Sequence, residues 1–314
     1  MKPAAVVVNF NGGDDLPRCL DALSRQTVPV DVTVVDCASE DGSRRVAQAP
    51  PTGVRGVPLP RNVGFAGGCN AGLGSIVPDA EVIGFFNPDC FPEPEFFAAC
   101  LRLLDEDPRI AGVAPRLTRE DGSTLDSCGQ TLTPGLLRVR DRGYDEPAGG
   151  RFTARADVLA ACGAAMVYRR AALEAVAVAG EVFPAEFFAF WEDLDLGWRV
   201  SGAGWRVVYE PAARATHRRG GTAEAGRGRL IFRRSPALAA CVLVNRWATL
   251  IRNLHRLDFL LRLPVLLPAD VMMVAYIVAR RPRVGPALAR ALPRIAAAWR
   301  ARHAIVRRRL AELP

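Results

Sequence analysis

Apolar and polar residues alternate in blocks along the first part of the chain. Three short apolar runs, each typical of a buried strand, occupy residues 4–10, 31–36 and 81–86, and a weaker strand pattern occupies residues 53–59. Between the first two runs, Leu16, Leu20 and Leu23 recur at helical spacing. Apolar strands separated by helices predict an α/β fold whose parallel sheet is covered on both faces. Such sheets bind ligands at the carboxyl ends of their strands.

The pattern becomes less regular after residue 105. Residues 105–160 predict mixed strands and a loop over the ligand site. Residues 160–176 indicate a strand that runs into a helix, and Asp193–Ser201 indicates a short helix that ends at the sequence GAG. Residues 205–211 indicate a further strand. We therefore assign residues 1–234 to one α/β domain.

From Ser235 onward, apolar helices studded with arginine define a second region, residues 235–314. The run Leu263–Ala279 contains two prolines and Asp270, and it is shorter than the roughly 20 residues that a spanning helix needs. It predicts a basic amphipathic helix that lies in a membrane interface, where flanking arginines contact lipid phosphates. These are Arg256, Arg262, Arg280, Arg281 and Arg283. A helical cap on the core or an oligomer interface is the alternative.

Charge is divided unevenly between the two parts of the chain. Residues 1–217 hold 21 Lys/Arg and 29 Asp/Glu, whereas residues 218–314 hold 20 Arg and 4 Asp/Glu. An acidic body with a basic tail is typical of proteins that meet phospholipid, nucleic acid or a phosphorylated substrate. The tail mixes arginine with long aliphatic runs and has few aromatic residues for base stacking, which disfavours nucleic acid. A non-enzymatic membrane-surface or nucleic-acid-binding protein stays open as the alternative to an enzyme.

The eight cysteines are scattered, with no CxxC and no cluster with histidine. This spacing argues against a zinc site and predicts buried free thiols in a reducing compartment. The chain enters its first strand almost at once, which predicts a cytoplasmic protein without a cleavable signal.

A glycine-rich segment, Asn62–Gly72 (NVGFAGGCNAG), lies between a predicted strand and a helix. Its spacing is neither GxGxxG nor that of a P-loop, so it argues against an NAD-dependent dehydrogenase and an ATP site. A glycine-rich turn that opens a helix still offers backbone N–H groups to a ligand. A plain tight turn explains the glycines equally well.

Two acidic motifs are candidates for chemistry. Asp89, in FFNPDC, follows a buried strand, where a carboxylate suits a hard divalent cation that also takes diphosphate oxygens. In FFAFWEDLDLGWR, aromatic residues precede the acids Glu192, Asp193 and Asp195. Apolar surroundings raise the pKa of a carboxylate and make it a better proton acceptor. Ordinary turn and helix-start preferences account for acids at both places, and Asp195 is spaced to pair with Arg199.

His217 follows the strand predicted at residues 205–211. At that point the chain returns to the carboxyl edge of the sheet, so we expect His217 to lie beside Asp89 and Asp193.

Six ordered segments between Ala4 and His217 together resemble the family 2 glycosyltransferases of the GT-A fold. They are VVVNFNG, VVDCASEDGS, RNVGFAGGCNAG, FFNPDC, GAAMVYRRAAL and FFAFWEDLDLGWRVSGAGWRVVYEPAARATH. Within that family the chain is most similar to bacterial rhamnosyltransferases and galactofuranosyltransferases of cell-envelope assembly. The resemblance implies a Rossmann-like nucleotide-diphospho-sugar transferase fold, and the arginine-rich helical tail also resembles this subgroup.

The resemblance also implies roles for individual residues. The nucleotide-sugar site would comprise Val8, Asn9, Phe10, Asp36, Asn62, Gly64, Gly68, Asn70 and Asn87. Asp89 matches the last position of the family's DxD motif and, with His217, would hold Mg²⁺ or Mn²⁺. Asp193 would be the general base and Glu192 its neighbour in acceptor binding, with Phe188 and Trp191 on the acceptor side. Asn87 replaces the first Asp of DxD, and Cys37 stands where relatives usually carry Asn, which puts base or ribose contacts there in doubt.

The implied activity is inverting, metal-dependent transfer of a sugar from a nucleotide-diphosphate donor in one displacement. The subgroup favours rhamnose from dTDP-rhamnose as the donor and a glycan or polyprenyl-linked acceptor. Such an enzyme would sit peripherally at the inner face of the plasma membrane.

Overall fold

The computed structural model describes residues 1–219, 232 and 234–311, with side chains to residue 306. The four strands predicted in the first part of the chain are β1 (Pro3–Asn9), β2 (Asp31–Asp36), β3 (Val54–Pro58) and β4 (Val82–Phe86). They pair in parallel in the order β4-β1-β2-β3. Their carboxyl ends therefore lie along one edge of the sheet, as the sequence predicts.

Helices cover both faces of the sheet. They are α1 (Asp15–Ser24), α2 (Ser43–Gln48), α3 (Gly64–Leu73), α4 (Phe96–Glu106), α5 (Arg170–Val176) and α6 (Glu192–Gly202). Every residue of β1 is buried: Val6 and Val8 point into the core under α3, α5 and α6, and Ala5 and Val7 into the core under α1 and α4. The uninterrupted apolar runs are explained by this burial on two faces.

The remaining strands are β5 (Cys90–Pro92), β6 (Ile110–Thr118), β7 (Leu125–Ser127), β8 (Gln130–Leu132), β9 (Val139–Asp141), β10 (Ala156–Val158), β11 (Ala165–Arg169) and β12 (Arg206–His217). β11 lies antiparallel between β4 and β6, and β12 runs parallel to β6. β8 and β9 form a separate two-stranded ribbon. These elements confirm the mixed strands predicted for residues 105–160.

β12 is longer than the strand predicted at residues 205–211. It continues through Pro211 with a shift of register between Glu210 and Arg214. A bulge of this kind accommodates a proline, which cannot donate to the ladder. The extension pairs His217 with Cys90, and so brings the histidine next to Asp89.

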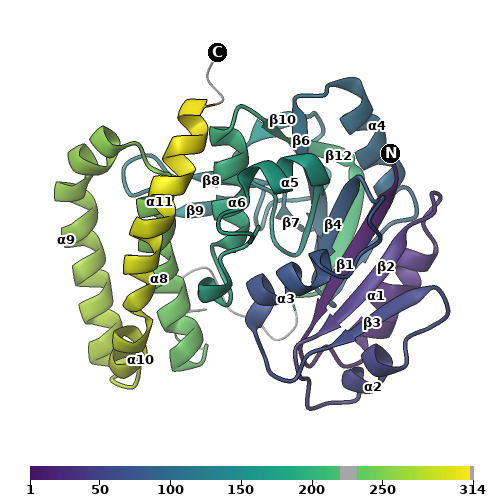
Figure 1. The fold of residues 1–314 in the computed structure, drawn as a ribbon, viewed down its shortest axis with the longest axis horizontal. Helices are drawn as coiled ribbons and strands as arrows, with labels where there is room; N and C mark the ends of the chain where they lie inside the picture. The colour runs from purple at the N-terminus through teal and green to yellow at the C-terminus, as the bar shows by residue number, and fades with distance from the viewer. Residues whose placement is uncertain (220–231, 233, 312–314) are drawn as a thin grey trace.

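The C-terminal region is helical, as predicted: α8 (Pro236–Asn253), α9 (Arg256–Arg280), α10 (Val284–Ala291) and α11 (Pro293–Ala311). Figure 1 shows these helices at one side of the molecule, next to α6, with β2 and β3 at the other side. Ala248 and Ile251 of α8 pack against Phe187, Trp191 and Leu194. The division into residues 1–234 and 235–314 remains a proposal.

The apolar run of this region belongs to a longer helix than the sequence predicts. Pro264 and Pro268 lie inside α9, which continues for 25 residues. A proline removes one backbone hydrogen bond and bends a helix without having to end it. Within the described part of the chain, α9 is the one helix long and apolar enough to cross a membrane, and 17 % of its most apolar window is buried.

Candidate active site

Asn9 and Asp36, at the carboxyl ends of β1 and β2, form a buried polar cluster. Nδ2 of Asn9 lies 2.8 Å from Oδ1 of Asp36 and donates also to the hydroxyls of Ser39 and Ser43. The backbone N–H of Ser39 donates to the other Asp36 oxygen at 3.1 Å. Both side chains are fully buried and hold the loop after β2 against β1. Phe10, the next residue, is 47 % exposed at this edge.

The glycine-rich segment is shaped by close packing. Gly64 has φ +73°, and a Cβ on it would lie 2.2 Å from the carbonyl oxygen of Phe188. A Cβ on Gly68 would lie 2.4 Å from the side chain of Val8. The amide of Asn70 binds the backbone of Phe183 in both directions, at 2.8 and 3.0 Å. These contacts hold Phe183 and Phe188 against α3, and α3 against β1. The side-chain oxygen of Asn62 accepts from the N–H of Gly64 at 2.8 Å.

Asp89 and His217 converge as the sequence predicts. Oδ1 of Asp89 lies 3.4 Å from Nε2 of His217, and Nδ1 of His217 lies 2.7 Å from Oδ2 of the buried Asp126. Burial by itself would lower the pKa of His217, but its bonds to Asp126 and Asp89 outweigh burial and raise that pKa to about 9. Asn87 lies at the start of the same turn, where its backbone N–H donates to Ala164 at 3.0 Å.

The chemistry of this pair fits a divalent cation. A carboxylate and an imidazole point at one another, and the far nitrogen of the imidazole is held by a second carboxylate, the usual support of a metal-binding histidine. No group of three or more His, Cys, Asp or Glu side chains suited to a metal occurs among the described residues. Asp89 and His217 could hold Mg²⁺ or Mn²⁺ only together with donor phosphate oxygens or water.

Asp193 lies in the first turn of α6 and is held by three donors. Its Oδ2 accepts from the backbone N–H of Gly163 at 2.8 Å and from the side-chain amide of Gln130 at 2.9 Å. Its Oδ1 accepts from the N–H of Leu194 at 2.8 Å. Burial raises the pKa of Asp193 above its ordinary value, and the three hydrogen bonds oppose that shift. Asp193 is therefore a fixed carboxylate with increased basicity.

Glu192 has a different environment from Asp193. It is 5 % exposed, and its Oε2 is buried with no hydrogen-bond partner among the described residues. Burial, and then the charge of Asp193, raise the pKa of Glu192 well above its ordinary value. Both effects favour the neutral form of this carboxyl, which can donate a hydrogen bond.

The aromatic segment before α6 is strained and partly buried. Phe188, Phe190 and Trp191 have φ of 62°, 73° and 75°, values uncommon outside glycine. Phe187 and Trp191 face the C-terminal helices, and Phe188 is half-buried beside Gly64. The acceptor-side role of Phe188 and Trp191 stays a prediction, because Trp191 is 8 % exposed and largely taken up by this packing.

Sequence reasoning missed the contribution of the irregular region to this site. Asp126 on β7, Gln130 on β8 and Asp141 on β9 bring polar side chains to His217, Asp193 and Arg219. Burial, with the charge of Asp126, raises the pKa of Asp141 to about 6 although Arg219 opposes the shift. The available signal was the concentration of polar residues in DSCGQT, between Leu125 and Leu132.

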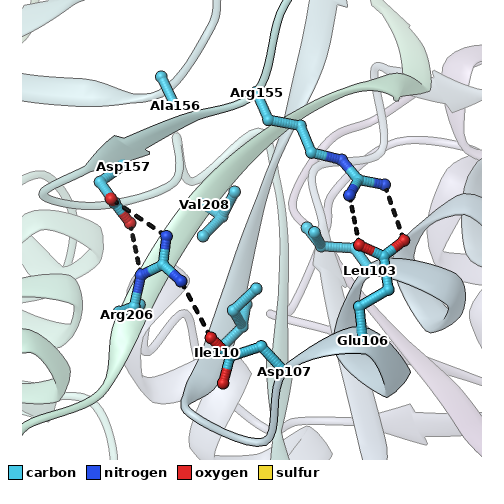
Figure 2. A pocket seen from close by; sticks show the side chains of 9 residues that line it. All are labelled: Leu103, Glu106, Asp107, Ile110, Arg155, Ala156, Asp157, Arg206 and Val208. Carbon is cyan, nitrogen blue, oxygen red and sulfur yellow. Dashed lines mark hydrogen bonds and ion pairs between the residues drawn. The ribbon is translucent and has the colours of Figure 1, made fainter.

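A hollow at the opposite edge of the sheet is a separate feature. Figure 2 shows it between α4, β10 and the start of β12. Its charged side chains pair with each other: Arg155 with Glu106, and Arg206 with Asp107 and Asp157. Arg206 begins β12 and His217 ends it, so this hollow lies a full strand length from the acids described above.

Residues 3–236 match the family described as glycosyltransferase like family 2. A curated relative from Mycobacterium tuberculosis, N-acetylglucosaminyl-diphospho-decaprenol L-rhamnosyltransferase, is 30 % identical over 240 residues, which are 68 % of this chain and 74 % of the relative.

Solved structures with the same fold include S. aureus TarS 1-349 in complex with UDP-GlcNAc. It has a TM-score of 0.57 and 16 % identity, over 99 % of this chain and 89 % of that one. A mannosyltransferase, PcManGT from Pyrobaculum calidifontis in complex with GDP-Man and Mn²⁺, has a TM-score of 0.55 and 19 % identity, over 99 % and 86 %. In a longer TarS structure, this chain covers 43 % of the length. These likenesses show the GT-A fold.

Proposed function

The chain belongs to glycosyltransferase family 2, and from that premise we propose that it transfers a rhamnosyl group from dTDP-rhamnose to a lipid-linked glycan acceptor, with inversion at the anomeric carbon. One observation carries the proposal. A buried carboxylate with raised pKa, Asp193, is bonded to Gly163 just before β11, and Asp89, the partner of His217, follows β4, the strand that pairs with β11. One displacement reaction needs both a base for the acceptor hydroxyl and a site for the leaving diphosphate, and these two groups can supply them.

Asp193 acts on the acceptor. Its raised pKa suits it to take the proton of a hydroxyl, and Gly163, Gln130 and Leu194 hold it in one orientation while the hydroxyl attacks. Attack from the face opposite the departing diphosphate inverts the anomeric carbon in a single step. Glu192, whose pKa is raised by burial and by the charge of Asp193, would contact the acceptor beside this base.

Asp89 and His217 act on the donor. They would hold Mg²⁺ or Mn²⁺, and such an ion would supply positive charge to offset the charge of the leaving nucleoside diphosphate. Asp126 fixes the orientation of the His217 ring at 2.7 Å. The nucleoside would lie over Val8, Asn9 and Phe10, where Phe10 is the exposed member of the three.

The donor and acceptor are proposed from likeness. The curated relative is named for a rhamnosyl transfer onto a diphospho-decaprenol carrier, which supports a rhamnose donor and a polyprenyl-linked acceptor here. PcManGT was solved with a nucleotide sugar and Mn²⁺, which supports a divalent cofactor.

We also propose that the enzyme works at the cytoplasmic face of the membrane through α9. Large apolar side chains of this helix are exposed, among them Leu260, Leu261, Val265, Val271 and Met272. The arginines at its two ends suit lipid phosphates. Flotation with anionic vesicles checks this: binding that survives high salt supports apolar insertion, and binding that is lost entirely in salt contradicts it.

The experiment that tests the enzymatic proposal is a screen of nucleotide sugars with and without Mn²⁺. Thermal shift reports binding, and release of nucleoside diphosphate in the presence of a polyprenyl diphosphate glycan reports transfer. We expect dTDP-rhamnose to give both signals with Mn²⁺ only. Stabilisation and turnover by a different nucleotide sugar alone would disprove the rhamnose donor, and metal-independent turnover would disprove the cofactor.

A further inference from the structure

Arg234 occupies an unusual position between the active site and the C-terminal helices. Its guanidinium stacks on the ring of Phe190, with Cζ 3.7 Å from the ring centroid. Phe190 is three residues before Asp193, so the stack places a cation beside the loop that carries the base. The carbonyl oxygen of Arg234 accepts from Nη2 of Arg281 at 2.7 Å, which joins it to the end of α9.

The guanidinium of Arg234 has unused hydrogen-bonding capacity. Its Nη1 is buried with no hydrogen-bond partner among the residues that the structure describes. Leaving a buried cationic donor unsatisfied is costly, so this group needs a partner such as a water molecule or an anion. Burial, and then the positive charge of Arg219, lower the pKa of Arg234 to about 10. An anion placed there would relieve both the unsatisfied donor and the repulsion.

The surroundings of Arg234 are fixed in advance. The side-chain amide of Asn245 donates to the carbonyls of Phe187, Ala189 and Phe190 at 2.9, 3.0 and 2.9 Å. This clamp maintains the strained φ of Phe190 and therefore the direction of its ring. Strain retained at such a loop is a common property of ligand sites.

The order of groups along a lipid-linked acceptor matches this arrangement. In such a molecule the phosphates lie between the apolar chain and the sugar that carries the attacking hydroxyl. Here Arg234 lies between α9, with its exposed apolar face, and the loop that ends at Asp193. α9 ends at Arg280 and is followed by α10, and Figure 1 shows α10 next to this end of α9.

We propose that Arg234, seated on Phe190, binds the phosphate groups of a lipid-linked acceptor. The inference rests on the proposed function, because it concerns the acceptor of the same reaction. Arginine suits the role, since its fork of N–H donors matches phosphate oxygens. The donor diphosphate would instead be held at Asp89 and His217.

Direct binding tests the site without turnover. The probes are farnesyl diphosphate, farnesol and inorganic pyrophosphate, titrated into the full chain by calorimetry. In Arg234→Gln we expect the affinity for farnesyl diphosphate to fall by about tenfold or more, because a charge-assisted hydrogen bond is lost. We expect Arg234→Lys to restore part of this affinity. Binding of farnesol should not change. The control is Arg290→Gln, which removes the same charge from an exposed position of α10.

Several outcomes would overturn the proposal. They are no binding of farnesyl diphosphate by the wild type, an unchanged affinity in Arg234→Gln, or an equal loss in Arg290→Gln. A matching loss of nucleotide-sugar affinity would assign Arg234 to the donor instead. Pyrophosphate binding as tight as that of farnesyl diphosphate would show a site for free phosphate. A wild type that binds farnesyl diphosphate but turns over no nucleotide sugar would leave the site standing and sink the proposed function.

Discussion

Nε of Arg252 on α8 lies 2.8 Å from Oδ1 of Asp195 on α6, in a position where both side chains are buried. The other oxygen of Asp195 accepts from Nε of Arg199 at 2.8 Å, the pair that the sequence predicts. One carboxylate thus lies between two guanidinium groups. It joins α6, the helix that carries Asp193, to α8 of the C-terminal region. Burial would raise the pKa of Asp195, but Arg252 and Arg199 hold it below its ordinary value.

Asp195→Asn should destabilise the protein more than Arg252→Met. Removing the carboxylate leaves two buried guanidinium groups without their counter-charge, at a cost of about 3–5 kcal/mol. Removing Arg252 leaves Asp195 paired with Arg199, so neither buried charge lacks a counter-charge and the loss of stability is smaller. Urea unfolding measures both, with the exposed Asp258→Asn as control. Equal losses in the first two variants would contradict this account.

The same carboxylate makes stability depend on pH. The pKa of Asp195 is lower in the folded state than in the unfolded state, where it is near 4. Asp195 therefore stabilises the fold fully above the unfolded pKa, and this stabilisation is lost as the pH falls through the folded pKa. Wild-type stability should therefore fall below about pH 4 more steeply than that of Asp195→Asn. Unfolding free energies measured from pH 7 to pH 3 check the difference in slope.

Asn245 should act as a positioning residue for the base. In Asn245→Asp the side chain keeps its shape but cannot donate to the carbonyls of Phe187, Ala189 and Phe190, so the loop before Asp193 relaxes. We expect kcat to fall by about 10²-fold, while the Kd of the donor with Mn²⁺ stays unchanged. A parallel loss of donor affinity and melting temperature would indicate a purely structural role.

Asp193→Asn should abolish transfer and retain donor binding. An amide cannot accept the proton of the acceptor hydroxyl, although it fills the same space and keeps one acceptor oxygen for Gly163 or Gln130. A loss of about 10²–10⁴-fold in kcat is expected for a general base. Turnover at the wild-type rate in this variant would remove Asp193 as the base.

Gln130→Leu should move the acid limb of the pH–rate profile. Gln130 lowers the pKa of Asp193 against the effect of burial, so its removal raises that pKa further. The base must be ionised to work, and kcat/KM should therefore begin to fall at a higher pH in the variant than in the wild type. An acid limb that does not move would separate Asp193 from the observed titration.

Asp89→Ala and His217→Ala should both weaken nucleotide binding that depends on Mn²⁺. Asp126→Asn should cost about 10–100-fold in metal affinity, because Asp126 orients the imidazole from behind. Asp157→Ala, in the hollow of Figure 2, is the matched control and should have no effect. Calorimetry with and without metal measures all four; unchanged binding in the first two would show that the metal site is elsewhere.

The sequence by itself determined the local elements and the ends of the strands. Uninterrupted apolar runs required burial on two faces, which fixed the parallel half-sheet and the edge at which Asn9, Asp36 and Asp89 lie. The first turn of α6 and the Asp195–Arg199 pair follow from helical spacing alone. These features depend on neighbours within a few residues, which periodicity reports.

Only the tertiary structure decided which distant groups surround the acids. Asp126 reaches His217 across 91 residues, Gln130 reaches Asp193 across 63, and Arg252 reaches Asp195 across 57. The irregular region that supplies Asp126 and Gln130 has strands of three residues, too short to show a period. Periodicity records which face of an element is buried, but packing between elements decides which partner covers that face. Packing alone placed the C-terminal helices against the loop that precedes Asp193.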